Sequence, residues 1–213
     1  MLGIVDYQAG NHTSVARALR ALDIPCVITN EPAKLQACVG LIFPGVGAAG
    51  QAMATLQSSG MAQTLKELVQ SQVPLLGICL GAQILLEYSA ENDTKLLGLV
   101  KGECRKFAQG LTQEDGSKRP IPHMGYNQLN FVADCPLFAK IAPEACYYFV
   151  HSYYMQPSKE LIIATTNYGE TFCSVYGRNG LWGLQFHPEK SGRPGLSILK
   201  NFYNYCQEIS HAQ

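Results

Sequence analysis

Short apolar runs alternate with stretches of helical periodicity in the N-terminal part of the chain. Short apolar runs indicate strands, whereas apolar positions three and four residues apart indicate helices. We predict strands at Leu2–Val5, Pro25–Ile28, Val39–Phe43 and Val73–Ile78, and helices after Asn11, from about Met61 to Ser71 and at Ala82–Tyr88. This strand–helix–strand order predicts a Rossmann-like α/β fold, with a mostly parallel sheet and helices on both faces.

The pattern changes to short β-like runs separated by polar turns between about Leu97 and Val175. These runs are Leu99–Phe107, Tyr147–Val150, Leu161–Ala164 and Thr171–Tyr176, and Glu114-Asp115-Gly116-Ser117 is the clearest hairpin or loop. A strand at Leu181–Phe186 and a helix after Pro194 follow. The chain of 213 residues fits one domain, 1–213, with an additional β-rich segment.

The composition argues against several classes of function. Lys plus Arg and Asp plus Glu number 16 each, so the chain has no excess of positive charge that would indicate a nucleic acid as the ligand. No apolar run approaches the roughly 20 residues of a membrane span, and Asp6 comes too early for a secretion signal. The eight cysteines form no CxxC pair, which argues against a zinc site or a redox dithiol. We expect neither a metal nor a cofactor. We expect a cytoplasmic protein whose cysteines are mostly buried thiols.

One cysteine lies in a different context. The segment Gly77-Ile78-Cys79-Leu80-Gly81 is a cysteine version of the Gly-x-Ser-x-Gly nucleophile elbow, between a predicted strand and a predicted helix. The glycines avoid side-chain clashes at the sharp turn, and the positive end of the helix dipole favours the thiolate of Cys79. A core cysteine between two packing glycines would produce the same pentapeptide, so the partners of Cys79 decide between the two interpretations.

Two other segments supply those partners. Pro44-Gly45-Val46-Gly47 follows an earlier strand of the same predicted sheet, so its backbone N–H groups at Val46 or Gly47, with that of Leu80, can converge on an oxyanion. His187 directly follows the strand Leu181–Phe186 and precedes Pro188-Glu189, so a carboxylate two residues away can bind the imidazole. Each segment alone is more often a turn. Together with the elbow they predict a nucleophile, a base and an oxyanion hole.

These residues resemble those of a known family. Gly77–Gln83 and Gln185–Glu189 are similar to the motifs of the class I (triad) glutamine amidotransferases. Further segments resemble one family of subunits among them, the glutaminase subunits of imidazole glycerol phosphate synthase; they are Asp6-Tyr7 with Gly10-Asn11, Pro44–Gly47, Pro122–Asn127, Tyr148–Tyr153 and Lys190-Ser191-Gly192. The resemblance covers essentially the whole chain. Tyr126 stands where that family often has Trp, and the segment 109–119 is longer than expected.

The resemblance implies a function and a set of site residues. Cys79, His187 and Glu189 would form the catalytic triad that hydrolyses L-glutamine to glutamate and ammonia. Gln83 lies one helical turn after the cysteine, so its amide can reach the bound glutamine. By resemblance, Glu91 and the backbone of Ser152 and Tyr153 would hold the amino and carboxylate groups of the substrate.

The resemblance also implies a partner. A (βα)8-barrel cyclase subunit would consume the ammonia and make imidazole glycerol phosphate in histidine biosynthesis, because this chain is too short to contain a barrel of about 250 residues. Tyr126 and Lys190 are the candidate contacts with the partner. We expect the isolated chain to be a poor glutaminase that the barrel activates by turning the Val46–Gly47 peptide toward the oxyanion.

Three alternatives remain open at this level. A related glutaminase subunit that serves the amidination of surface sugars would share nearly every motif. A stand-alone γ-glutamyl hydrolase or peptidase on the same fold would need neither Lys190-Ser191-Gly192 nor Pro122–Asn127. A scaffold protein with an inactive glutaminase fold is disfavoured by the intact triad.

Overall fold

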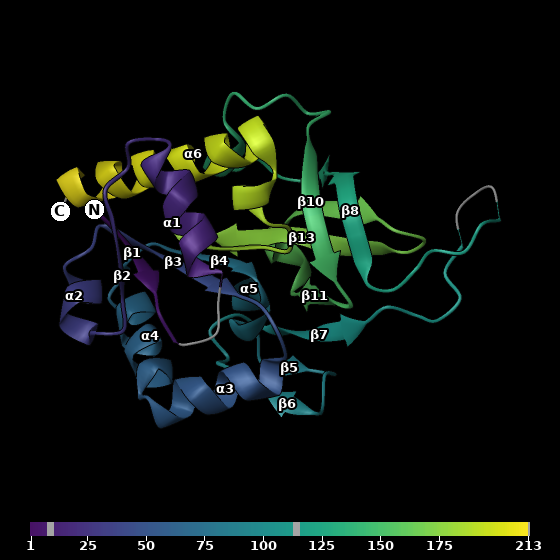
Figure 1. The fold of residues 1–213 in the computed structure, drawn as a ribbon, viewed down its shortest axis with the longest axis horizontal. Helices are drawn as coiled ribbons and strands as arrows, with labels where there is room; N and C mark the ends of the chain where they lie inside the picture. Colours follow the sequence, from purple (N-terminus) through teal and green to yellow (C-terminus); the bar gives the residue numbers. More distant parts are fainter. Residues whose placement is uncertain (8–10, 113–115, 213) are drawn as a thin grey trace.

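The computed structural model describes residues 1–7, 11–112 and 116–212. Within these residues, twelve strands form one sheet, and ten of them follow the order β2-β1-β3-β4-β14-β13-β11-β7-β5-β6 (Figure 1). The first five strands of this order are parallel to one another; they are β2 Cys26–Thr29, β1 Leu2–Val5, β3 Gly40–Gly45, β4 Leu75–Cys79 and β14 Leu181–Leu184. The predicted α/β fold with its mostly parallel sheet is confirmed.

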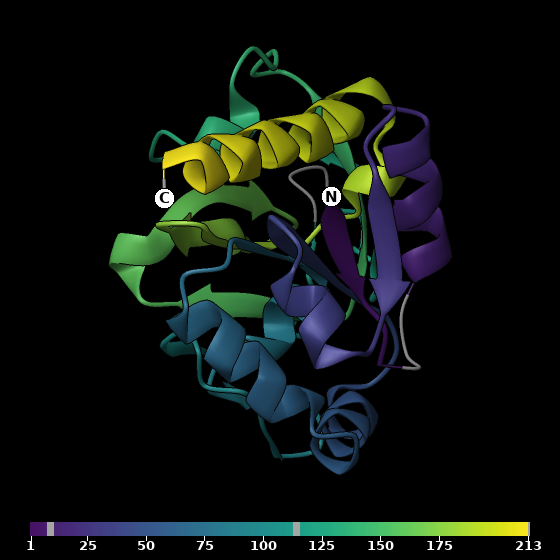
Figure 2. The same ribbon diagram turned by 90° about the vertical axis from the view of Figure 1, so that its left-hand side faces the viewer.

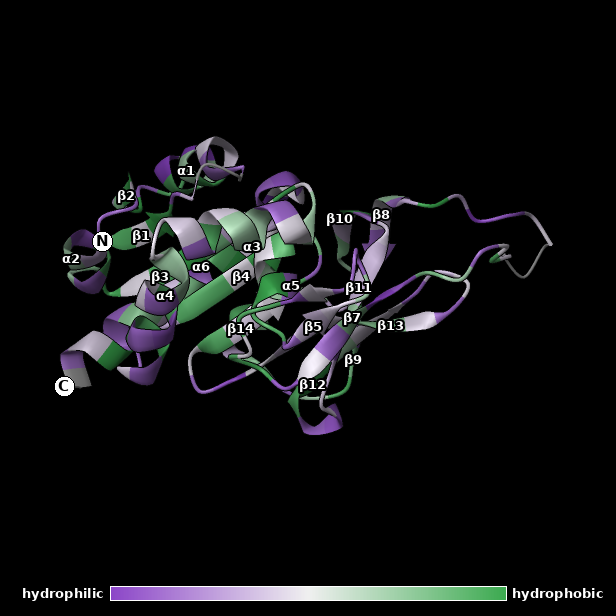
Figure 3. Ribbon diagram, turned by 90° about the horizontal axis from the view of Figure 1, so that it is seen from below, coloured by the Kyte–Doolittle hydropathy of each residue, from purple (hydrophilic) through white to green (hydrophobic). Residues whose placement is uncertain are grey.

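Helices cover both faces of the parallel strands, as the view along the sheet shows (Figure 2). On one face lie α1 His12–Arg20 and α6 Gly192–Ala212, which share a hydrophobic core with β1 and β14. On the other face lie α2 Pro32–Gln36, α3 Ala49–Ser58, α4 Met61–Gln70 and α5 Leu80–Ile84. The central strands and α5 are among the most hydrophobic parts of the ribbon, and helices remove both faces of these strands from water (Figure 3).

The β-rich segment extends the sheet with mostly antiparallel strands. These are β13 Thr171–Arg178, β11 Tyr153–Pro157, β7 Gly102–Lys106, β5 Tyr88–Ser89 and β6 Thr94–Lys95, with β12 Ile162–Asn167 and β9 Asn130–Phe131 paired beside them. The strands β8 His123–Gln128 and β10 Cys146–His151 form a separate antiparallel pair, in which His151 lies opposite His123. Three 3-10 turns complete the described elements, at Pro136–Phe138, Lys159–Leu161 and Pro188–Lys190.

Several predicted boundaries differ from the structure. The helix predicted at Ala82–Tyr88 is the shorter α5, and Tyr88 belongs to β5, because the chain turns back after Ile84. The last helix begins at Gly192 rather than after Pro194. The pattern missed α2, α3, β8 and β11, and also the two-residue strands β5, β6 and β9. Residues 114 and 115 of the predicted hairpin, and residue 10 of the Gly10-Asn11 motif, lie outside the described residues.

Candidate active site

The nucleophile candidate occupies a strained turn between β4 and α5. Cys79 has φ +53° and ψ −113°, a left-handed region that residues other than glycine seldom enter. The two glycines of the motif allow the turn to pack closely. A Cβ atom at Gly77 would lie 2.7 Å from the Cα atom of Ala82, and one at Gly81 would collide with the carbonyl oxygen of Phe43. The predicted reason for both glycines is therefore confirmed.

The Pro44–Gly47 segment lies beside this turn. Gly45 is the register partner of Cys79 at the ends of the parallel strands β3 and β4. The next two residues, Val46 and Gly47, leave the sheet, and Gly47 adopts φ +90° with open space where a Cβ atom would be. Leu80, the first residue of α5, follows the cysteine directly. The structure thus brings the three residues proposed for the oxyanion hole to one edge of the sheet.

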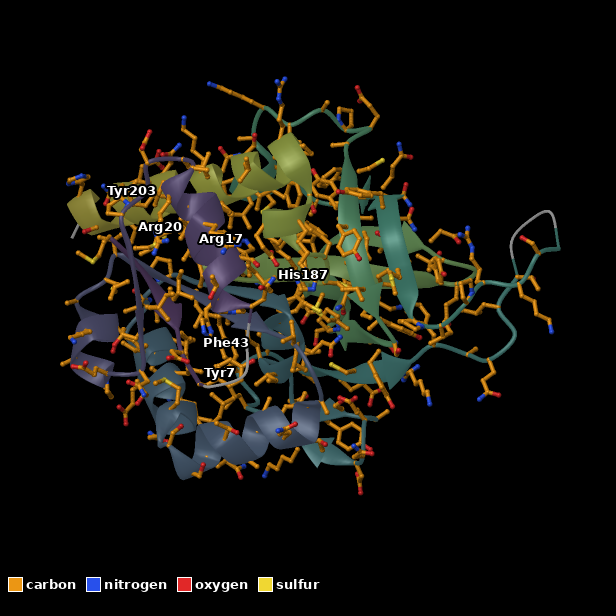
Figure 4. The ribbon with its side chains drawn as sticks, viewed as in Figure 1. Tyr7, Arg17, Arg20, Phe43, His187 and Tyr203 are labelled. Atoms are coloured by element: carbon orange, nitrogen blue, oxygen red, sulfur yellow. The ribbon has the colours of Figure 1, made fainter. Side chains whose placement is uncertain are left out.

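The histidine and the carboxylate of the candidate triad are in direct contact. His187 follows β14, and its backbone N–H donates to the Tyr148 carbonyl oxygen at 2.9 Å. The Nδ1 atom of His187 lies 2.8 Å from Oε1 of Glu189, and both side chains are almost completely buried. Asn11 donates a second hydrogen bond to the same Oε1, at 3.0 Å. Figure 4 shows His187 near the centre of the molecule, between the parallel strands and the β8–β10 pair.

The charge of His187 depends on its two neighbours. Burial alone would lower its pKa, but Cys79 and Glu189 outweigh burial and raise the pKa of His187 to about 10. Cys79 acts on His187 through its proximity as well as its charge, although within the described residues the Nε2 atom of His187 makes no hydrogen bond of regular geometry. This arrangement favours the imidazolium form of His187, with Nε2 left available for a reacting group.

A cavity of about 320 Å³ connects these groups. Nine residues predicted from the sequence line it, and they are Val46, Gly47, Cys79, Leu80, Gln83, Glu91, Ser152, Tyr153 and His187. Glu189 lies behind the histidine and is not among the lining residues. Val150 and His151 also line the cavity and were not predicted as site residues. Both belong to the Tyr148–Tyr153 motif, so the sequence contained the information from which they could have been predicted as site residues.

The residues proposed to bind the substrate have structural partners. Gln83 is buried, and its Nε2 atom donates to the Tyr153 carbonyl oxygen at 2.8 Å, so it is not a solvated helix residue. Glu91 accepts a hydrogen bond from the backbone N–H of Ala49 at 2.7 Å, at the start of α3. The carbonyl oxygen of Ser152 accepts the N–H of Phe107 at 3.2 Å. These contacts fix the walls of the cavity before any ligand binds.

Two further histidines form a buried pair beside the triad, and one of them, His151, lines the cavity. Nδ1 of His123 lies 3.0 Å from Nε2 of His151, whose Nδ1 atom lies 2.8 Å from the Tyr153 carbonyl oxygen. Burial, with Arg119 nearby, lowers the pKa of His123 to about 4. Burial, followed by the influence of His123, lowers the pKa of His151 to about 3. Both rings are therefore neutral near pH 7, and neither can serve as a cationic partner of Cys79.

The two residues proposed to contact a partner touch each other. The hydroxyl of Tyr126, an exposed side chain on β8, donates to the carbonyl oxygen of Lys190 at 3.0 Å. The Nζ atom of Lys190 lies 5.8 Å from the centre of the Tyr148 ring. Ser191 accepts the N–H of Tyr148 at 2.9 Å and donates to the His187 carbonyl oxygen at 2.6 Å. The β8–β10 pair is thus bonded directly to the segment that carries His187.

The described part of the chain contains no cluster of three or more His, Cys, Asp or Glu side chains that could hold a metal ion. In the same residues no helix is long and apolar enough to cross a membrane.

Comparisons with known proteins agree with this geometry. The model of the family "Glutamine amidotransferase class-I" matches residues 3–206. Two proteins named imidazole glycerol phosphate synthase subunit HisH, from Desulfovibrio desulfuricans and Nitratidesulfovibrio vulgaris, are 59% and 58% identical to this chain, and each alignment covers 100% of both sequences. The fold matches a crystal structure of a glutamine amidotransferase with a TM-score of 0.74 and 16% identity, over 97% of this chain and 98% of the other. The chain therefore belongs to the class I glutamine amidotransferases and, within them, to the family of imidazole glycerol phosphate synthase subunit HisH.

Proposed function

We propose that this chain hydrolyses L-glutamine with Cys79 as the nucleophile, His187 as the acid and base, and Glu189 as the orienting carboxylate. The observation that carries the proposal is the shared cavity, in which Cys79 occupies a nucleophile elbow and His187 is held by Glu189 at 2.8 Å. The placement of each group matches its role in the reaction.

The reaction has two stages. The Cys79 thiolate attacks the side-chain carbonyl carbon of glutamine, the C–N bond breaks, and ammonia departs with a proton from His187. Neutral His187 then takes a proton from water, the water oxygen attacks the glutamyl thioester, and the C–S bond breaks to release glutamate and the thiolate. Glu189 stabilises the imidazolium and keeps the ring oriented throughout.

The oxyanion formed in each stage needs hydrogen-bond donors. We assign these to the backbone N–H of Leu80 and to the Val46–Gly47 peptide, which lies next to Cys79. Gly47 has a positive φ and no close neighbours at its Cβ position, so the peptide has room to rotate. One oxyanion donor contributes roughly 10²–10³ in rate, so this rotation alone can control activity strongly.

The partner would be a (βα)8-barrel cyclase subunit that uses the ammonia to make imidazole glycerol phosphate in histidine biosynthesis, in a cytoplasmic heterodimer. The names of the HisH relatives support this assignment over the surface-sugar pathway and the stand-alone hydrolase. Tyr126 and Lys190 would face the barrel, because Tyr126 is exposed and bonded to the segment that carries the triad. Contact there would be transmitted to the site as allosteric activation.

Glutamate release by the chain alone, with the barrel, and with the barrel plus its nucleotide substrate tests the activation. We expect a large stepwise increase, blunted by Gly47→Pro but not by surface substitutions in residues 109–119. Equal rates in all three conditions would favour the stand-alone hydrolase instead.

Labelling and a separation of activities test the triad. A glutamine-analogue alkylator should modify Cys79 in the wild type and equally in Cys146→Ala, which removes an exposed thiol. In the assembled pair, Cys79→Ala should abolish synthesis from glutamine and retain synthesis from added ammonium salt. Modification mainly at Cys38 or Cys173 would contradict the assignment of the nucleophile.

A further inference from the structure

Gln185 is a completely buried polar side chain that the mechanism above does not use. It follows the end of β14 and precedes His187 by two residues, and its backbone N–H donates to the Ser174 carbonyl oxygen at 2.9 Å. A buried amide needs hydrogen-bond partners, and the partners of Gln185 include the reacting sulfur. Its Nε2 atom lies 3.8 Å from Sγ of Cys79, within the range of a hydrogen bond to sulfur.

The orientation of the Gln185 amide follows from a backbone group. The carbonyl oxygen of Tyr153 can only accept hydrogen bonds, so the side-chain atom of Gln83 that contacts it at 2.8 Å must be nitrogen. The same nitrogen contacts the Gln185 amide at 3.0 Å, so Gln185 must present its oxygen there. Its NH₂ group is left to face Cys79.

The same carbonyl fixes the neighbouring histidines. Because Tyr153 accepts from Nδ1 of His151 at 2.8 Å, the Nε2 atom of that neutral ring must accept from His123. All hydrogen bonds around the Tyr153 carbonyl therefore point toward it. Reversing the Gln185 amide would place two NH₂ groups against each other at 3.0 Å, which makes that arrangement unfavourable.

We propose that Gln185 is a further catalytic residue, which donates a hydrogen bond to the Cys79 sulfur and stabilises its thiolate. The donor acts in the resting enzyme and again when the C–S bond of the thioester breaks and its electron pair returns to sulfur. The contact with sulfur stands on geometry alone, whereas its use in glutamine hydrolysis rests on the proposed function.

The test compares two substitutions at this position. Gln185→Met keeps most of the side-chain volume and removes the donor. Gln185→Glu keeps the shape and the acceptor for Gln83, and places a negative charge beside the thiolate in alkaline solution. Ser174→Ala is the matched control, because Ser174 is equally buried and is bonded to the Gln185 backbone, but its side chain bonds to Thr166 and Ala164.

Iodoacetamide alkylation of Cys79, followed by peptide mapping across a pH series, measures the thiolate without requiring glutaminase activity. Loss of a hydrogen bond to the charged sulfur is expected to change the rate of Cys79 alkylation by about tenfold or more. We expect Gln185→Met to slow alkylation near neutral pH by about this factor and to move its pH midpoint upward. At about pH 8, Gln185→Glu should be slower still, and Ser174→Ala should match the wild type. A purely structural role predicts the opposite order, with the isosteric Glu variant closest to the wild type.

Alkylation profiles of folded Gln185→Met and Gln185→Glu proteins that match the wild type would overturn the proposal. If both variants fail to fold, NMR of the glutamine side-chain amides, labelled with ¹⁵N, tests the contact in the wild type. The resonance of one buried amide should shift as the thiol of Cys79 ionises, and it should stay constant in Cys79→Ala. The absence of a resonance that behaves in this way would also overturn the proposal. Glutamate release by wild type with its barrel is measured alongside. If release is absent while the profiles differ, only the proposed function fails.

Discussion

Acid is expected to unfold this protein through the two buried histidines of the β-rich segment. The pKa is about 4 for His123 and about 3 for His151 in the folded chain, against an ordinary value of 6.5. Above pH 6.5 both rings are neutral in the folded and unfolded states, so their contribution to stability is complete. As the pH falls from 6.5 toward 4, the unfolded chain binds two protons that the folded chain does not, and the free energy of unfolding decreases.

The size of the effect follows from the difference in bound protons. Each histidine contributes a slope of about 1.4 kcal/mol per pH unit in this window, so the pair removes roughly 5 kcal/mol between about pH 7.5 and pH 4.5. That loss is comparable to the whole stability of many domains, about 5–15 kcal/mol. His187 acts in another window, because its pKa is raised to about 10. Its contribution is complete below pH 6.5 and decreases as the pH rises toward 10.

The variant His123→Phe removes one of the two groups that bind a proton and leaves the other. The introduced phenyl ring would fit the site, because His123 is stacked between Phe149 and Tyr168 at centroid distances of 4.8 and 3.9 Å. We expect the slope to fall to about half of the wild-type value, with a loss of about 1 kcal/mol at pH 7.5 because His151 loses its donor.

Urea unfolding at several pH values measures these slopes. Thr166→Val is the matched control, because it removes a buried hydrogen bond of 3.0 Å without removing a titrating group, so it should lower stability and keep the wild-type slope. Equal slopes for the wild type and His123→Phe would refute the assignment of the acid sensitivity to this pair.

Three other substitutions test the site. Gly81→Ala should destabilise the fold by several kcal/mol in urea unfolding, because its Cβ atom would collide with a backbone carbonyl of β3. The control Gly50→Ala, on helix α3, should be neutral or stabilising by about 0.5–1 kcal/mol, and similar unfolding midpoints for the two variants would show that the elbow is not tightly packed. Glu189→Gln should slow glutamate release less than Cys79→Ala does, and it should lower the pKa of His187, which pH–rate profiles would measure. Activity equal to that of the wild type would show that Glu189 is not part of the triad. Tyr126→Phe removes the hydroxyl contact at 3.0 Å and should weaken activation by the barrel while leaving the isolated chain unchanged, and a change only in the isolated chain would contradict the proposed interface.

The sequence alone determined the parallel core and most residues of the candidate site; it missed Val150 and His151 of the cavity lining. Each proposed catalytic group lies at or just after the end of a strand, in a motif whose spacing is local. Cys79 needs its flanking glycines, and Glu189 reaches His187 across only two residues. Parallel strands end at one edge of their sheet, so local motifs were sufficient to place these groups together. That residues 1–213 form one domain stays a prediction.

Only the tertiary structure decided how the cavity walls are held. Helix α3 has little contrast between apolar and polar positions, and its start is instead fixed by Glu91, 42 residues from its partner Ala49. The amide of Gln83 is oriented by a carbonyl 70 residues away, and Gln185 meets a sulfur 106 residues away. A buried amide bonds to whichever groups the fold brings within about 3 Å, and no local pattern specifies those groups. The sequence therefore indicates which atoms react, and the packing of distant segments determines how they are oriented.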